Sequence, residues 1–257
     1  MRTDGWRLAI GTFTRIPVPP PATVGRESAR AAMLLGPAVM IVPTLIIGVL
    51  AQILVTMTDT PGLLGGALAI GMLAWLTRAL HLDGLADTAD ALGSGRPATQ
   101  ALEIARRSDI GPFGVVVLVL TLVIQVIALG DLLDRGAGAG AVVIAVVTGR
   151  LAMMISCTPA FPAARPDGLG ATVAGAVPTW AAWLTTLGWT LLFAGAVGRA
   201  HGSPAALATT VSIIGGILVG VVLARIARRR LGGITGDTLG ASGELAMTTV
   251  LVLLVMT

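Results

Sequence analysis

The sequence contains several uncharged runs, most of them long enough to cross a lipid bilayer as a helix. A hydrocarbon core about 30 Å thick needs on the order of 20 apolar residues per helical span. The uncharged runs lie at 31–58, 60–77, 110–130, 136–149 (continuing past Arg150), 168–198, 202–224 and 245–257. Only 12% of the residues are charged, against roughly a quarter in soluble domains. We therefore predict one integral membrane domain over residues 1–257, an all-α polytopic bundle of about seven transmembrane spans.

Two of these runs have unusual lengths. The last has only 13 residues, which is short for a span. The run at 168–198 has 31 residues, so it predicts either a re-entrant stretch or a helix that begins near Pro178.

The positive charges predict the orientation of the chain. All 17 basic residues are arginine, and the segments 1–30, 78–109 and 225–230 are rich in them. These three segments fall on one side when the spans alternate, so the positive-inside rule places them, and the N-terminus, in the cytoplasm. The arginines flank apolar segments, which favours contact with lipid phosphates over nucleic acid. No cleaved signal peptide is expected.

Three aspartates share one face of a predicted helix after the second run. Asp83, Asp87 and Asp90 have the spacing i, i+4, i+7, which places them within about 60° of one another. Because like charges at this spacing repel, the arrangement favours a bound cation. Mg²⁺ prefers oxygen ligands and is usually held by one or two carboxylates together with substrate phosphates. The alternative is a solvated acidic helix, but the chain has only 13 acidic residues, so we predict a site for phosphate chemistry.

A second acidic group lies in the polar segment 225–244. Asp237 and Glu244 are seven residues apart, again on one helical face, and a glycine-rich stretch before them offers backbone N–H groups to a phosphate. The arginines at 225–230 are better interpreted as topology anchors than as ligands. Both acidic groups fall on the cytoplasmic side of the predicted topology, which predicts a shared site there.

Three further features leave alternatives open. His81 lies near the opposite side of the helix from the aspartates, so a role in hydrogen bonding or proton transfer and an ordinary interfacial histidine are both compatible with it. Arg150 interrupts an apolar run and is expected to face the bundle interior, paired structurally or with an anionic ligand. Cys157 is the only cysteine and has an apolar context, so we expect a small buried residue.

Five motifs together resemble the cobalamin synthase family, the adenosylcobinamide-GDP ribazoletransferases, over nearly the whole chain. They are FTRIPVP (13–19), HLDGLADTAD (81–90), ALEIARRSDIGPFG (101–114), the pair at 149–150, and LGGITGDTLGASGEL (231–245). In one place the chain departs from the family pattern: Arg107 and Asp109 exchange the charges that the family usually has there. We therefore leave this segment out of the core site.

The resemblance implies a bacterial inner-membrane enzyme with its active site facing the cytoplasm. It would join adenosylcobinamide-GDP to α-ribazole, or its 5′-phosphate, and release GMP with Mg²⁺ as cofactor. The implied site residues are His81, Asp83, Asp87, Asp90, Asp237 and Glu244, and we assign Asp83, Asp87, Asp90 and Asp237 as the metal ligands. Asp90, Glu244 and His81 are candidate general bases. Both a monomer and an oligomer are compatible with the sequence.

Two other functions fit less well. A CDP-alcohol phosphatidyltransferase also uses aspartates on membrane helices, but its motif has Ala-Arg where this chain has Ala86 and Asp87. A transporter would use acidic residues within broken helices near the midplane, whereas here they cluster in predicted loops at one face.

Overall fold

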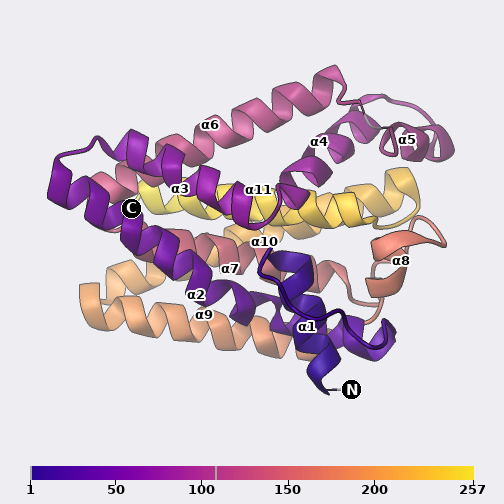
Figure 1. The fold of residues 1–257 in the computed structure, drawn as a ribbon, viewed down its shortest axis with the longest axis horizontal. Helices are drawn as coiled ribbons and strands as arrows, with labels where there is room; N and C mark the ends of the chain where they lie inside the picture. The colour runs from indigo at the N-terminus through magenta and orange to yellow at the C-terminus, as the bar shows by residue number, and fades with distance from the viewer. Residues whose placement is uncertain (1, 108) are drawn as a thin grey trace.

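In the computed structural model, which describes residues 2–107 and 109–257, helices form all the regular structure apart from one isolated β-bridge between Ala163 and Ile234. The helices (Figure 1) are α1 (Arg2–Phe13), α2 (Arg26–Thr58), α3 (Gly62–Leu76), α4 (Leu80–Gly93), α5 (Ala98–Ile104), α6 (Pro112–Asp134), α7 (Gly138–Ser156), α8 (Gly168–Val173), α9 (Thr179–His201), α10 (Ser203–Leu231) and α11 (Gly236–Val255).

Within the described residues, six helices are long and apolar enough to cross a membrane, namely α2, α6, α7, α9, α10 and α11. The pair α3 and α4 passes the same test together, although the two helices meet at an angle of 90°. The prediction of an all-α bundle of about seven spans is therefore confirmed. The long run at 168–198 contains the short α8 and then α9, which begins at Thr179 directly after Pro178 and so confirms the helix start expected there.

The break between α3 and α4 gives the aspartate helix its direction. Arg78 and Ala79 both have left-handed backbone angles, with φ of 56° and 53°, a conformation that few residues other than glycine adopt. The segment after α1 braces this corner. There the backbone N–H of Arg15 donates to the carbonyl of Leu76 (2.7 Å), and its guanidinium lies 4.0 Å from the centre of the Trp75 ring. As a result, α4 leaves the line of α3 and packs against α11.

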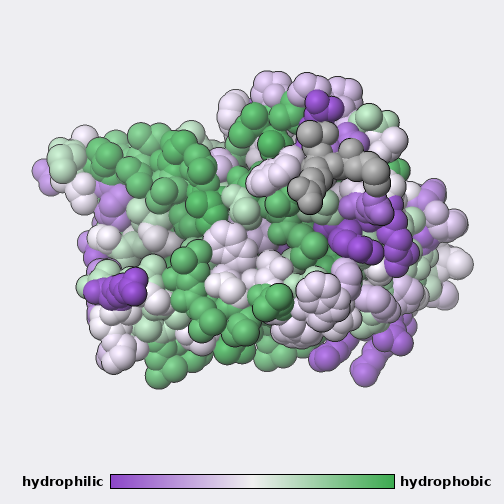
Figure 2. All heavy atoms as spheres, turned by 90° about the horizontal axis from the view of Figure 1, so that it is seen from below, coloured by the Kyte–Doolittle hydropathy of each residue, from purple (hydrophilic) through white to green (hydrophobic). Residues whose placement is uncertain are grey.

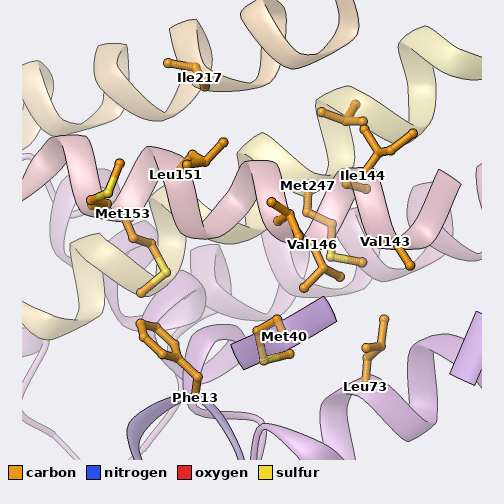
Figure 3. Close-up of a cluster of buried hydrophobic side chains, with 14 of the residues drawn as sticks. Phe13, Met40, Leu73, Val143, Ile144, Val146, Leu151, Met153, Ile217 and Met247 are labelled. Atoms are coloured by element: carbon orange, nitrogen blue, oxygen red, sulfur yellow. The ribbon is translucent and has the colours of Figure 1, made fainter. Parts of the chain in front are cut away.

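The centre of the bundle is α7, which is buried on all sides from Ala141 to Ser156. Figure 3 shows Leu151 and Met153 of this helix among side chains of α1, α2, α10 and α11. Gly149 lets α7 approach α11 closely, because a Cβ there would lie 2.7 Å from the carbonyl oxygen of Gly243 on α11. Small residues at such crossings let helices pack closely in lipid. Helix α11 is thereby held firmly, with its first turn at one end of the bundle.

One sequence-based boundary is wrong. The last span begins at Gly236, not near 245, so Asp237 and Glu244 lie inside α11 and not in a loop. Thr235 starts the helix: its hydroxyl accepts a hydrogen bond from the N–H of Thr238 (3.2 Å), and the Thr238 hydroxyl accepts one from the N–H of Thr235 (2.8 Å). Hydropathy alone missed this turn because the acidic residues interrupt the apolar run.

The surface of the bundle is mostly apolar, and its hydrophilic residues gather mainly at one end. Figure 2 shows apolar residues over much of one face, with the largest group of hydrophilic residues toward the end of the bundle where α8 lies in Figure 1. That end also carries α4, α5 and the start of α11. The predicted acidic groups therefore lie at the more polar end of an otherwise apolar bundle.

Candidate active site at one end of the bundle

Two glycines bring α4 and α11 into backbone contact. A Cβ on Gly84 would lie 2.8 Å from the Cα of Asp237, and a Cβ on Gly240 would lie 3.0 Å from the Cα of His81. No larger residue fits at either position without separating the helices. The two acidic groups, which are about 150 residues apart in the chain, are thus brought to the same end of the bundle.

Three carboxylates lie within electrostatic reach of one another there. Asp83 is exposed, and Asp87 and Asp237 are partly buried. The charges of Asp83 and Asp237 both act on Asp87, and the charge of Asp83 also acts on Asp237. In the described part of the chain, neither Asp83 nor Asp87 has a hydrogen-bond or ion-pair partner, whereas Asp237 accepts a hydrogen bond from the Thr235 hydroxyl (3.2 Å). No arginine among the described residues forms an ion pair with this group, although Arg165 lies within electrostatic reach of Asp87 and Asp237.

This group of side chains fits Mg²⁺ only with help from a ligand. Among the described residues, no three His, Cys, Asp or Glu side chains are arranged to hold a metal ion on their own. Mg²⁺ does not need such a cage, because it is commonly bound by one or two carboxylates, waters and the phosphates of a substrate. Asp83, Asp87 and Asp237 offer hard oxygen donors of this kind, so the metal site remains a prediction.

Asp90 has a different environment from the other two aspartates of α4. It is buried, and its two carboxylate oxygens accept hydrogen bonds from the N–H groups of Gly111 (2.7 Å) and Gly114 (2.9 Å) at the start of α6. A carboxylate at a helix N-terminus satisfies N–H groups that have no partner within the helix. The spacing of the sequence put Asp90 on the aspartate face, but its contacts join α4 to α6. Whether it also binds a metal is untested.

Arg165 also lies at the site, although it was not among the residues predicted from the sequence. It lies in the segment 157–167 between α7 and α8, where its guanidinium donates to the carbonyl of Leu102 and lies near enough to Asp237 and Asp87 to feel their charges. Partial burial, and then the charge of Arg106, lower the pKa of Arg165. One signal in the sequence could have pointed to Arg165: its short polar segment joins two predicted spans on the same side of the membrane as both acidic groups.

A second contact from this segment crosses the same end of the bundle. Asp167 accepts two hydrogen bonds from the guanidinium of Arg106, at 2.7 and 2.8 Å. Both side chains are more than half exposed. Arg106 therefore ties the segment after α5 to the one before α8. The arginines at the end of α10 are exposed, and Arg228 donates to the carbonyl of Ala160 (2.9 Å), which agrees with a structural role.

A cavity of about 250 Å³ opens beside Asp237, the one carboxylate of the three that lines it. It is lined by residues of α1, α2, α4, α7, α8, the segment before α8, and the start of α11. Asp237 and Arg165 are among its polar lining residues, and Met33, Met153 and Leu239 are among its apolar ones. The site therefore combines a charged group with an adjoining small pocket.

His81 lines this cavity and is almost fully buried, at 2% exposure. Its ring stacks on Phe13, with the centroids 6.1 Å apart and the planes 6° from parallel. Neither ring nitrogen has a hydrogen-bond partner in the described residues. It is not an ordinary interfacial histidine, because its buried ring faces the protein interior, against Phe13 and within electrostatic reach of Arg150.

Glu244 lies deeper in the bundle than the other acidic residues. Seven residues along a helix separate it from Asp237 by about 10 Å. Its carboxylate accepts a hydrogen bond from the side-chain amide of Gln125 (3.0 Å) and acts electrostatically on the buried Arg150. Arg150 faces the interior as expected, with its guanidinium 5.4 Å from the centre of the Phe13 ring. These contacts favour a structural role for Glu244, and its predicted catalytic role is untested.

Fold and site together define a polytopic helical membrane protein with acidic side chains, an arginine and a small cavity at one end of its bundle. The family model described as cobalamin-5-phosphate synthase matches residues 5–255. The chain belongs to this family, which confirms the resemblance inferred from its motifs.

Similar proteins cover the same length. A protein of a Nocardioides species is 41% identical over 96% of this chain and 96% of its own length. A protein of Frankia casuarinae is 38% identical over 98% of this chain and 94% of its own length, and one of Pseudomonas entomophila is 38% identical over 95% and 96%. All three are named adenosylcobinamide-GDP ribazoletransferase. No solved structure matches the chain.

Proposed function

We propose that this chain is an Mg²⁺-dependent transferase that joins adenosylcobinamide-GDP to α-ribazole, or to its 5′-phosphate, and releases GMP. The names of full-length relatives at 38–41% identity support the reaction. The structural observation that carries the proposal is the meeting of Asp83, Asp87 and Asp237, from two distant stretches, beside Arg165 and a cavity. Such a group suits a diphosphate that arrives with a divalent cation.

The reaction exchanges one phosphoester partner for another. The ribose 3′-hydroxyl of α-ribazole attacks the phosphorus nearer cobinamide, the bond from that phosphorus to the bridging oxygen breaks, and GMP leaves with that oxygen. The hydroxyl proton passes to a base. Catalysis of such a transfer depends mainly on positioning and charge neutralisation.

The residues of the chain have separate tasks in this proposal. Asp83, Asp87 and Asp237 would hold Mg²⁺ jointly with the diphosphate, and the bound ion supplies positive charge to the phosphate oxygens. Arg165 donates to a phosphate oxygen from the opposite side. Asp90, Glu244 and His81 stay the candidate bases for the hydroxyl proton, and of these three His81 alone lines the cavity. Asp90 also fixes the position of α4 against α6.

We also propose that the site end of the bundle faces the cytoplasm of a bacterial inner membrane. Most of the arginines belong to segments at this end, including 1–30, 78–109 and 225–230. The positive-inside rule then supports a cytoplasmic location for the N-terminus and the site. Both nucleotide substrates would reach the carboxylates from that side.

The test is GMP release by the purified protein in lipid nanodiscs, supplied with adenosylcobinamide-GDP, α-ribazole and Mg²⁺. A chelator should abolish release, and added Mg²⁺ should restore it. If no GMP appears under conditions in which a known family member is active, the proposed reaction is wrong. If release continues after chelation, the reaction stands and the metal assignment fails.

A further inference from the structure

We propose that the cavity between α8, α11 and the start of α4 binds the bicyclic aromatic base of α-ribazole, a dimethylated benzimidazole. The ribose would then lie at the cavity rim, with its 3′-hydroxyl toward the carboxylates. This inference rests on the proposed function and assigns one of the two substrates to a place in the structure.

The cavity has an apolar floor and a polar rim. Met33, Met153 and Leu239 line it and are 3%, 4% and 1% exposed, so they form its deep wall. Arg165 and Asp237 line it too but are only partly buried. An aromatic ring is stabilised at the floor because its apolar surface leaves water, whereas a ribose with its hydroxyl groups suits the rim.

The volume of the cavity limits which part of the two substrates can bind in it. An apolar protein cavity of about 150 Å³ holds one benzene ring. A cavity of about 250 Å³ therefore fits a two-ring base and is too small for a corrin macrocycle. The corrin ring must lie elsewhere, and the candidates for this cavity are the base of α-ribazole and the guanine of the nucleotide.

His81 favours the base of α-ribazole. Its two unpartnered nitrogens are desolvated, and a buried polar group without a partner is costly until a ligand supplies one. After ribose is attached, a benzimidazole keeps one ring nitrogen as a hydrogen-bond acceptor, which can accept from an N–H of His81 once a small shift of the imidazole uncovers it, since both nitrogens are fully covered in the unliganded protein. The near-parallel ring of Phe13 holds the imidazole in a fixed plane for that contact.

Guanine fits this floor poorly. Its edge carries several donors and acceptors, and most of them would face Met33, Met153 and Leu239 without a partner. Burying a polar group without a hydrogen bond is unfavourable by kilocalories per mole. The methylated edge of the benzimidazole has no polar atoms, so it can lie against methionine and leucine side chains.

The test is a substitution that fills part of the cavity from its outer wall. Ala171 lines the cavity from α8, a short surface helix, so Ala171→Phe places a ring inside it. The neighbouring Thr172 does not line the cavity, and Thr172→Phe is the matched control. We expect Ala171→Phe to raise the KM for α-ribazole by about tenfold or more. The KM for adenosylcobinamide-GDP should stay within about twofold, as should both values in the control.

Calorimetric titration of α-ribazole into the nanodisc protein provides a second readout that needs no turnover. Binding that is weakened by Ala171→Phe and retained by Thr172→Phe supports the pocket, even if the wild type releases no GMP and the proposed reaction fails. Equal binding by both variants, or a rise only in the KM for adenosylcobinamide-GDP, overturns it. If the wild type neither binds α-ribazole nor releases GMP, both proposals are wrong. If Ala171→Phe lowers the melting temperature, Leu169→Trp at the exposed rim repeats the test.

Discussion

Asp83 is the exposed member of the aspartate face of α4, and its charge has no partner in the described residues. We expect Asp83→Asn to lower the kcat for GMP release by about 10²–10³-fold, the usual size for loss of one group that stabilises charge in the transition state. The melting temperature should not change, because no contact is lost. Glu103→Gln, an exposed charge loss on α5, serves as the control. Full activity of Asp83→Asn would remove this residue from the site.

We predict that Asp90 contributes mainly to the stability of the fold and less to the transfer reaction. Asp90→Ala leaves the N–H groups of Gly111 and Gly114 without their acceptor, so the free energy of unfolding should fall by about 1–3 kcal/mol. Thermal unfolding in detergent measures this, with the exposed Asp109→Ala as the control, expected within about 0.5 kcal/mol. A variant that keeps its stability and loses turnover would instead support Asp90 as the metal ligand predicted from its spacing.

At the scale of elements, the crossing of α4 over α11 sets the distance between the two acidic groups. Gly84→Ala would place a Cβ 2.8 Å from the backbone of Asp237, so the helices must separate. We expect a loss of about 1–3 kcal/mol in stability and a fall of about 10²-fold in GMP release from misplaced carboxylates. Gly71→Ala on α3, which has open space around it, should leave both unchanged. Equal behaviour of the two variants would contradict the crossing.

The membrane-spanning helices could be predicted from the sequence wherever the lipid environment alone determines their position. Uncharged runs mark the spans because an unpaired charge is costly in hydrocarbon, and Pro178 marks the start of α9 because proline suits a helix start. The first turns of α11 were missed because Asp237 and Glu244 looked like loop residues. Gln125, which donates to Glu244, lies on α6, and this contact becomes visible only in the fold.

The site was predictable to the extent that helical spacing decides it. The spacing i, i+4 gave Asp83 and Asp87 a common face, and the fold brings Asp237 beside them. The same spacing could not separate Asp90 from them, because its partners at the start of α6 are set by tertiary packing. Arg165 was missed for a similar reason: its segment has no periodic pattern, and only the fold places it near Asp237.

At the scale of the whole molecule, the polar end and the opposite end of the bundle differ in their number of arginines. The connections α2–α3, α6–α7 and α9–α10 lie at the end away from the site, and Arg135 and Arg199 are the arginines nearest to them. The remaining arginines, apart from the buried Arg150, belong to segments toward the site end. The positive-inside rule therefore predicts a single orientation of the bundle, with the site end in the cytoplasm.

This orientation is testable with single cysteines in a Cys157→Ala background, since Cys157 is buried and is the only native cysteine. Thr99→Cys on α5 and Arg229→Cys at the end of α10 are exposed at the site end, and Ser203→Cys is exposed at the other. In intact cells an impermeant maleimide should label Ser203→Cys alone, and permeabilisation should add the other two. Labelling of Thr99→Cys and Arg229→Cys from outside would show that the bundle has the opposite orientation. Labelling of only one of them from outside would place α4 and α11 at different membrane faces, and no common site for the diphosphate could then form.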